Sequence, residues 1–293
     1  MNASIHSAEL TVSSRTLGAM LTSIQCDGIE YLWQGDPEFW ADQAPVCFPI
    51  CGSLRGNRAE CSQGEVKDIK RHGFARFEEF CEEKRTDSEL TYLLRSSEKT
   101  KAMYPYDFEF RVSYAVEGRS LTFRYDITNT GKVDLPFFIG GHPAYRCPLL
   151  PGEDYTDYEI RFEKEEYADC MYPLESEKTL LDEDRRRVIV DHDKVLKLNH
   201  DLFPNDGLVF DDLRSRSLCY LNPKTGKGVR VDFSDFSNLV IWSTVKSAEF
   251  VAIEPWNGFS TKSSEDDVLE HKVNCQCAKV GETRTYRFTV TVL

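Results

Sequence analysis

The stretch "FEFRVSYAVEGRSLTFRYDI", residues 108–127, decides the fold of this 293-residue chain. Apolar and polar residues alternate around a turn at Glu117-Gly118-Arg119, with Phe108, Phe110, Val112 and Tyr114 before it and Leu121, Phe123, Tyr125 and Ile127 after it. A period of two is typical of strands that bury one face, and a glycine in a short connection favours a hairpin. The stretch therefore predicts an antiparallel hairpin with one side in a core.

The same period recurs along the whole chain. It predicts strands at residues 158–162, 229–233, 239–242, 250–253 and 285–292, and Asp27-Gly28 is typical of a two-residue hairpin turn. Only two short stretches, Asp36 to Ala41 and Glu175 to Asp184, are compatible with a helical turn or two. Many short strands without a linker or a repeat predict an all-β fold, a large antiparallel β-sandwich that forms a single domain over residues 1–293.

The composition excludes several partners. The chain has 36 Lys and Arg against 49 Asp and Glu, a formal net charge of -13, and such a field repels nucleic acid and anionic membranes. There is no run of about 18 apolar residues and no basic-then-apolar segment at the N-terminus, so we expect a cytoplasmic protein that is not in a membrane. The charge runs at 163–166 and 182–187 are expected on solvated loops or strand edges.

Ten cysteines are scattered through the chain, a pattern unlike a small secreted disulfide framework. In a reducing compartment we expect them to remain thiols. Cys275-Gln276-Cys277, four residues after His271, could form half of a metal site. No second pair with matching spacing follows, so core or surface thiols are the preferred interpretation.

Three polar stretches interrupt the strand pattern and place a proton-transferring side chain beside glycine or proline. They are "RHGFAR" (71–76) with His72, "GGHPAY" (140–145) with His142, and "IEPWNG" (253–258) with Glu254 at the expected end of a strand, which Pro255 and Gly258 stop. Each alone has a common structural explanation: a turn, a satisfied histidine, and a strand-end ion pair. Their separation in sequence does not show whether they meet in space.

Together with four other stretches, these motifs resemble the aldose 1-epimerase (galactose mutarotase-like) superfamily, and within it the bacterial branch typified by the lactose-operon X protein. The other stretches are "LWQGDPEFW" (32–40), "APVCFPICGSL" (44–54), "LFPNDGLVF" (202–210) and "IWS" (241–243). The matches occur in order over nearly the whole chain. The resemblance implies one large β-sandwich whose concave face holds a monosaccharide, with no metal and no organic cofactor.

The resemblance also assigns roles to five residues. It implies His142 as general acid, Glu254 as general base and His72 as a group that positions the substrate. Asp206, in "NDG", resembles the aspartate that holds sugar hydroxyls, and Arg76 is expected to contact a hydroxyl or the ring oxygen. Interconverting α and β anomers requires removal of the proton on the anomeric hydroxyl and protonation of the ring oxygen, so one base and one acid on opposite sides of C1 suffice.

The segment that binds the sugar in many relatives departs from the family pattern. In "GSLRGNR", residues 52–58, Ser53 stands where we expect arginine, while Arg55, Asn57 and Arg58 lie nearby. Four arginines near the expected site, Arg55, Arg58, Arg71 and Arg76, could suit a hexose phosphate, because guanidinium binds phosphate with two hydrogen bonds. A hexose-6-phosphate 1-epimerase therefore stays open as an alternative, and so does a homodimer.

Three other classes remain to be separated by experiment. A non-catalytic carbohydrate-binding or sensing protein would use the same sandwich with the aromatics Trp40, Trp242 and Trp256, without turnover. A glycoside hydrolase needs two carboxylates, which Asp206 and Glu254 could formally supply. A zinc hydrolase would coordinate the metal with the two histidines and the glutamate of the polar stretches.

Overall fold

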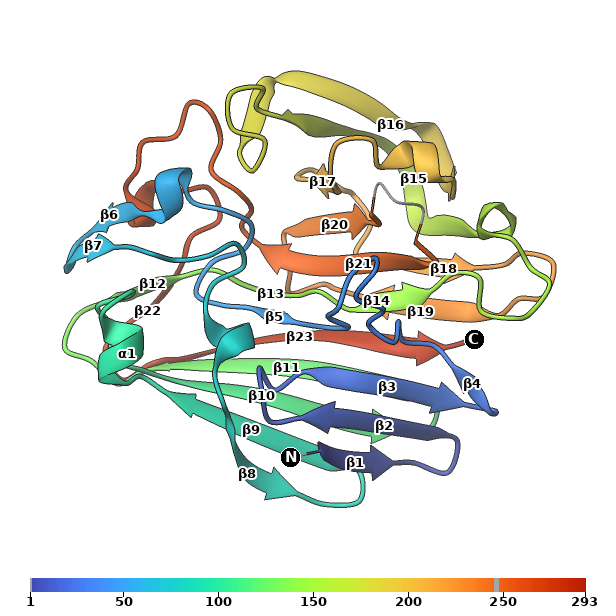
Figure 1. Ribbon diagram of the computed structural model, residues 1–293, viewed down its shortest axis with the longest axis horizontal. Coiled ribbons are helices and arrows are strands. Elements are labelled where there is room, and N and C mark those ends of the chain that lie inside the picture. Colours follow the sequence, from blue (N-terminus) through green and yellow to red (C-terminus); the bar gives the residue numbers. More distant parts are fainter. Residues whose placement is uncertain (1, 245–247) are drawn as a thin grey trace.

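The hairpin predicted over residues 108–127 lies inside the larger of two main sheets of the computed structural model, which describes residues 2–244 and 248–293 (Figure 1). Strands β10 (Phe108–Glu117) and β11 (Ser120–Asn129) pair from Phe108 with Asn129 to Glu117 with Ser120, so Gly118 and Arg119 form the turn. Every second residue of β10 is buried, so one face of the strand lies in the core, as the alternation predicts. The predicted antiparallel all-β fold is confirmed.

The larger sheet has nine antiparallel strands. In spatial order they are β16 (Leu181–Lys197), β15 (Glu159–Pro173), β18 (Ser217–Leu221), β19 (Gly228–Asp232), β23 (Thr283–Val292), β11 (Ser120–Asn129), β10 (Phe108–Glu117), β9 (Glu89–Arg95) and β8 (Cys81–Arg85). The C-terminal strand, β23, lies in the middle of this sheet, between β19 and β11. Segments from the middle and the end of the chain are thereby joined in one hydrogen-bonded layer.

The strands of the second main sheet are β17 (Leu208–Phe210), β20 (Asn238–Trp242), β21 (Phe250–Asn257), β13 (Ile139–Gly141) and β5 (Val46–Cys47), with β14 (Ala144–Arg146) also paired to β21. This sheet carries Glu254 on β21, and His142 lies between two of its strands, β13 and β14. A β-carbon added to Gly141 of β13 would lie 2.8 Å from Phe288 of β23 and from Tyr125 of β11. The two sheets thus pack face to face, with a large aromatic core between them.

Smaller sheets and short helices complete the fold. The smaller sheets are β1 (Asn2–His6), β2 (Leu10–Arg15), β3 (Leu21–Cys26) and β4 (Ile29–Glu30); β12 (Leu135–Phe137) with β22 (Gln276–Ala278); and β6 (Ala59–Cys61) with β7 (Gly64–Val66). The helical pieces are α1 (Glu98–Lys101) and the 3₁₀ turns η1 (Arg55–Asn57), η2 (Ala75–Phe77), η3 (Tyr155–Asp157), η4 (His200–Leu202) and η5 (Leu269–His271). The Asp27-Gly28 turn joins β3 to β4, as predicted.

Of the two stretches compatible with a helical turn or two, the first forms one turn and the second forms no helix. In 36–41 a single turn forms, in which the Trp40 N–H donates to Asp36 O. The stretch 175–184 instead forms the tip of the long β15–β16 hairpin and the start of β16, where Leu181 and Asp182 pair with Pro173 and Tyr172 of β15. This hairpin arches over the second sheet in Figure 1.

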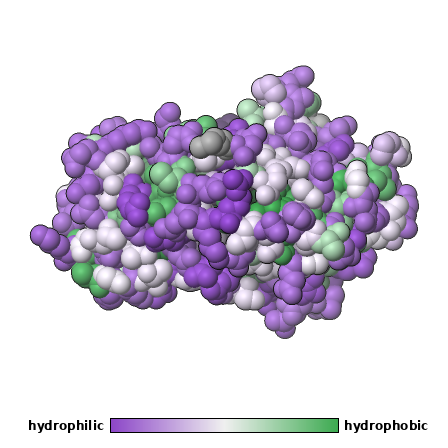
Figure 2. All heavy atoms as spheres, turned by 90° about the horizontal axis from the view of Figure 1, so that it is seen from below, coloured by the Kyte–Doolittle hydropathy of each residue, from purple (hydrophilic) through white to green (hydrophobic). Residues whose placement is uncertain are grey.

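The charge runs are in strands at the sheet edge, since β16 is the edge strand and β15 its neighbour. Glu166 is an exception to the expected solvation, because it is 1% exposed and accepts backbone N–H bonds from Arg214 (3.1 Å) and Ser215 (2.6 Å). The face in Figure 2 is mostly hydrophilic, with small separated hydrophobic groups. Among the described residues, no helix is long and apolar enough to cross a membrane.

Candidate functional site

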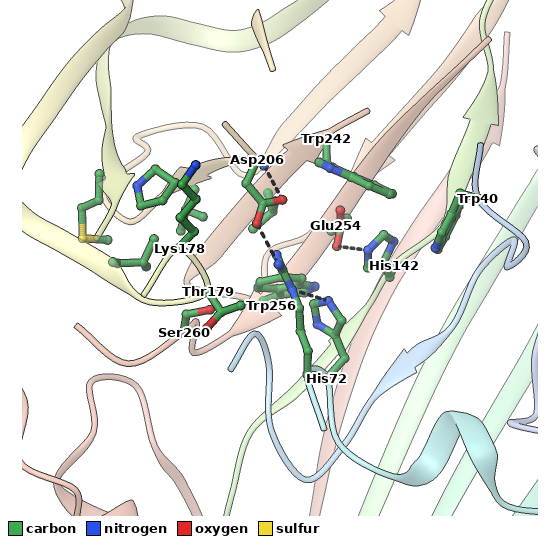
Figure 3. Close-up of a pocket in the computed structure, with 17 residues that line it drawn as sticks. Trp40, His72, His142, Lys178, Thr179, Asp206, Trp242, Glu254, Trp256 and Ser260 are labelled. Atoms are coloured by element: carbon green, nitrogen blue, oxygen red, sulfur yellow. Dashed lines mark hydrogen bonds and ion pairs between the residues drawn. The ribbon is translucent and has the colours of Figure 1, made fainter. Parts of the chain in front are cut away.

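A cavity of about 230 Å³ lies on the second sheet, beneath the tip of the β15–β16 hairpin (Figure 3). It brings together four of the five residues expected in the site, His72, His142, Asp206 and Glu254. The other lining residues are Trp40, Arg71, Met171, Pro173, Lys178, Thr179, Leu181, Gly207, Val209, Val240, Trp242, Trp256 and Ser260. Segments that are distant in sequence therefore meet at one place.

His142 and Glu254 are in direct contact. The Nε2 atom of His142 lies 3.1 Å from Oε2 of Glu254, and the side chains face each other in Figure 3. His142 is 6% exposed and Glu254 is 1% exposed. Two titratable side chains thus lie side by side, both largely buried, in the wall of one cavity.

The two glycines of "GGHPAY" are required by close packing. A β-carbon on Gly140 would lie 2.3 Å from Cδ1 of Trp256, and the indole Nε1 of Trp256 donates to Gly141 O at 3.2 Å. His142 follows directly, with its N–H donating to Pro45 O at 3.0 Å. Strand β13 ends at Gly141 and β14 begins at Ala144, so His142 and Pro143 form the break between them. The imidazole of His142 lines the cavity from this break.

Glu254 lies within a strand and does not end it, contrary to the expectation. Strand β21 continues through Pro255 to Asn257, and β20 pairs with it on one side. On the other side, β13 and β14 are interrupted opposite Glu254 and Pro255. A proline that cannot donate a hydrogen bond is tolerated there because no strand partner requires its donor.

Burial sets the protonation of the pair. It raises the pKa of Glu254 well above its usual value, the nearby Cys47 thiol acts in the same direction, and the positive charge of Arg71 opposes them. Burial, followed by the positive charge of Arg76, holds the pKa of His142 well below its usual value. These opposite shifts favour a state in which Glu254 holds the proton, the His142 ring is neutral and the pair carries no net charge.

His72 is held in an unusual backbone conformation. Its φ of 67° lies in the left-handed region, and Gly73 follows with a φ of 80° in a space where a β-carbon would lie 2.0 Å from Phe48 O. The Gly52 N–H donates to Nδ1 of His72 at 3.2 Å, and Nε of Arg71 is 3.2 Å from Nε2. Burial and the charge of Arg71 keep the pKa of His72 well below its usual value, so the ring is neutral.

Asp206 pairs with Arg71. Its Oδ2 lies 2.7 Å from Nη1 of Arg71, and its Oδ1 accepts from the Gly207 N–H at 2.9 Å. The loop that carries it leads into β17, which pairs with β20. Arg71 was expected only as one of several arginines for a phosphate, and the structure places it in the cavity wall beside the carboxylate.

Arg76 does not line the cavity. Its guanidinium pairs with Asp42, and its charge reaches the site only through space, where it lowers the pKa of His142. Direct contact between Arg76 and a sugar therefore stays a prediction. The residues expected near "GSLRGNR" are also elsewhere: Arg55 pairs with Asp267 at 3.0 Å, Arg58 pairs with Glu65, and Asn57 is exposed.

Sequence reasoning missed the wall formed by the β15–β16 hairpin. Lys178, Thr179 and Leu181 line the cavity from its tip, and Ser260 lines it from the segment after β21. The Leu181 N–H donates to Thr261 O at 3.0 Å, which ties this tip to that segment. An acidic stretch without strand periodicity carries no signal of this role in the sequence.

The donors of a metal site are not gathered. Among the described residues, no three His, Cys, Asp or Glu side chains form a group that could hold an ion. All ten cysteines are free thiols, as expected, and the His271 ring bonds to Asp266 at 2.9 Å and not to Cys275 or Cys277.

Comparison with known proteins identifies the family of the chain. The model of the aldose 1-epimerase family matches residues 2–285. The plasmid and chromosomal forms of Protein LacX from Lactococcus lactis subsp. lactis are each 42% identical over 292 residues, which covers 97% of this chain and 97% of theirs.

Solved structures show the same fold. The galactose mutarotase related enzyme from Lactobacillus acidophilus has a TM-score of 0.93 and 30% identity, with 100% of this chain and 97% of that chain covered. A galactose mutarotase-like protein from Lactobacillus casei ATCC 334 has a TM-score of 0.88 at 24% identity, with both chains fully covered. Because the family match extends over residues 2–285 and the relatives align along almost their full length, this chain belongs to the aldose 1-epimerase family.

Proposed function

We propose that this chain is an aldose 1-epimerase that interconverts the α and β anomers of an unphosphorylated hexose. Membership of the family supports an epimerase or mutarotase role on a sugar. The observation that carries the finer proposal is the contact of 3.1 Å between His142 and Glu254 in the wall of a small cavity.

The reaction needs an acid and a base at one carbon. Glu254 removes the proton of the anomeric hydroxyl while His142 protonates the ring oxygen, so the bond from C1 to that oxygen breaks. The aldehyde group then rotates about the bond from C1 to C2, and the ring closes on the other face as both protons return. General acid–base help of this kind contributes about 10²–10⁴ in rate.

The shared proton suits this cycle. When it lies on His142, the imidazolium is the acid and the carboxylate is the base, and the two atoms that carry it in turn lie 3.1 Å apart. Burial raises the pKa of Glu254, which makes its carboxylate a stronger base than an exposed one. At the end of a turnover each group has regained its starting state, so no cofactor is required to balance the protons.

Asp206 and His72 are proposed to hold the substrate. Both line the cavity, and the Arg71 pairing fixes the Asp206 carboxylate so that its oxygens can accept from sugar hydroxyls. Trp256 forms a flat wall beside them that suits the C–H face of a pyranose. These groups bind in both anomeric states and therefore contribute mainly to affinity.

The arginines favour a neutral substrate over a hexose phosphate. Each of the four candidates is paired with a carboxylate: Arg55 with Asp267, Arg58 with Glu65, Arg71 with Asp206, and Arg76 with Asp42. A phosphate bound by one of these arginines would compete with the carboxylate that already pairs with it. The remaining lining cation, Lys178, is exposed.

Anomer exchange measured by NMR tests the proposal. Purified protein is added to a panel of free hexoses and to their 6-phosphates, and exchange between the α and β signals is compared with the uncatalysed rate. We expect faster exchange with at least one free hexose, and its loss in Glu254→Gln. Binding without exchange would instead identify a carbohydrate sensor, and preference for 6-phosphates would contradict the neutral substrate.

A further inference from the structure

One ring nitrogen of His142 lacks the usual orienting partner. Catalytic histidines are commonly held in position by a hydrogen bond from the nitrogen that does not react. Here Nε2 lies 3.1 Å from Oε2 of Glu254 without hydrogen-bond geometry, and the buried Nδ1 has no hydrogen-bond partner in another described residue. Something other than a hydrogen bond must therefore fix the plane of this imidazole.

Two tryptophans contact the ring. Trp40 stacks on it with a centroid distance of 4.9 Å and an interplanar angle of 29°, and Trp242 meets it edge-on at 5.4 Å and 81°. The two indoles also pack against each other at 5.3 Å and 87°. In Figure 3, Trp40 lies on the side of His142 away from Glu254. The imidazole is thereby confined between the carboxylate and the indole of Trp40.

The position of Trp40 is itself fixed by a small hydrophobic cluster, separate from the main core, that includes Trp33 and Phe250. The Trp33 Nε1–H donates to Trp40 O at 2.8 Å, and Phe250 lies 5.5 Å from the Trp40 ring and 5.0 Å from the Trp33 ring. Trp40 is thus anchored through both its backbone and its ring. Its stacking on His142 is supported from behind.

We propose that Trp40 is a positioning residue that fixes the plane of the His142 imidazole and stabilises its protonated form. The face of an indole attracts a cation, so stacking favours the state in which His142 carries the shared proton. The inference rests on the proposed acid role of His142. The ionisable groups around the ring are Glu254 from β21, Arg71, His72 and Arg76 from the segment 71–76, and Asp42, which pairs with Arg76.

Three variants separate positioning from packing. Trp40→Phe keeps a flat ring, Trp40→Leu removes it, and Phe39→Leu is the matched control, because Phe39 packs on Trp33 at 6.4 Å in the same cluster. We expect Trp40→Leu to lower kcat about tenfold with KM within twofold, Trp40→Phe to restore most of kcat, and Phe39→Leu to resemble wild type.

The pH dependence of kcat distinguishes positioning from a simple loss of packing, which would not shift the profile. Without the indole face the pKa of His142 falls, so the acid limb of kcat should move to lower pH by roughly half a unit to one unit in Trp40→Leu. A rise in KM with unchanged kcat would show that Trp40 is a sugar platform, and an unchanged profile with unchanged kcat would also overturn the proposal.

A measurement without substrate separates this inference from the proposed function. The ¹⁵N signals of the His142 ring, assigned by their loss in His142→Asn, report its tautomer and its motion. We expect one defined tautomer in wild type and Phe39→Leu, and averaged or broadened signals in Trp40→Leu. Identical spectra in all three would disprove positioning by Trp40 even if wild type catalyses exchange. If wild type catalyses no exchange, the proposed function fails, and the spectra still decide whether Trp40 positions His142.

Discussion

Arg71 Nη1 lies 2.7 Å from Asp206 Oδ2 inside the cavity, and this ion pair makes the carboxylate a fixed part of the wall. The other Asp206 oxygen is held by the Gly207 N–H. A carboxylate oriented in advance loses little freedom when a sugar hydroxyl binds to it. We therefore expect the pair to prepare the binding of the substrate without taking part in proton transfer.

Replacing Arg71 by Gln should weaken substrate binding more than catalysis. The variant frees the Asp206 carboxylate to rotate, so we expect KM to rise about tenfold while kcat falls less than threefold, the size of a lost charge-assisted hydrogen bond. Initial rates of anomer exchange over a range of sugar concentrations give both constants. Arg58→Gln is the control, because Arg58 is largely exposed and pairs with Glu65 outside the cavity. A large fall in kcat alone would assign Arg71 to the chemical step.

Glu254→Gln and His142→Asn should each abolish most turnover while the sugar still binds. Both changes keep the approximate shape of the side chain and remove its proton transfer, so kcat should fall by about 10²–10⁴. Anomer exchange measures kcat, and calorimetric titration measures binding. Glu60→Gln, at an exposed carboxylate, is the control. Exchange at the wild-type rate in Glu254→Gln would remove Glu254 from the mechanism.

The strands could be predicted from sequence because each obeys a local rule. Alternation over 108–127 identifies β10 and β11, and alternation over 285–292 identifies β23. The pairing of β23 with β11 joins segments far apart in sequence, and no local pattern predicts it. The prediction that the strand ends at Glu254 was wrong for a related reason. Pro255 is tolerated inside β21 only because β13 and β14 are interrupted opposite it, and a neighbouring strand cannot be read from the sequence of this one.

The candidate site was recovered through resemblance and not through spacing. His142 and Glu254 are 112 positions apart, and only the pairing of β13 and β14 with β21 brings them together. Arg76 shows the limit of motif reasoning, because its guanidinium faces Asp42 and not the cavity. Arg71, five positions earlier in the same motif, lines the cavity instead.

The rate should depend on pH through the proton that His142 and Glu254 share. Below the depressed pKa of His142 both groups are protonated and no base remains; above the raised pKa of Glu254 the shared proton is lost and no acid remains. We therefore expect a bell-shaped profile of kcat/KM whose acid limb lies well below pH 6.5. Exchange is measured across pH with the uncatalysed rate subtracted. An acid limb at the usual histidine value would contradict a buried, neutral pair.

Stability should respond to the same burial. Burial raises the folded-state pKa of Glu254 well above that of an exposed glutamate, so the wild type is most stable, relative to a neutral side chain, below the pKa of the exposed group. As the pH rises toward the folded-state pKa, Glu254 ionises in the unfolded chain but stays protonated in the folded chain. Ionisation then stabilises the unfolded state, and the free energy of unfolding falls. Thermal unfolding of wild type and Glu254→Gln should therefore diverge with rising pH, with the variant becoming the more stable one. A constant difference in Tm from pH 4 to pH 9 would indicate an unperturbed carboxyl group.

Gly140→Ala should disturb both the fold and the site. The added methyl group would lie 2.3 Å from Cδ1 of Trp256 and 3.0 Å from Pro255 O, so the indole and the adjoining strand must move. Overpacking of this kind costs about 1–3 kcal/mol of unfolding free energy, measurable by urea denaturation. Since Gly140 is two residues from His142 and Pro255 follows Glu254, the same displacement should separate His142 from Glu254 and lower kcat at least tenfold.

Gly152→Ala is the control. A β-carbon added there meets nothing within 4 Å, so any loss of stability comes from the φ of 84° at Gly152 and should leave kcat unchanged. Equal kcat in Gly140→Ala and wild type would show that the contact between Gly140 and Trp256 does not hold the pair in place.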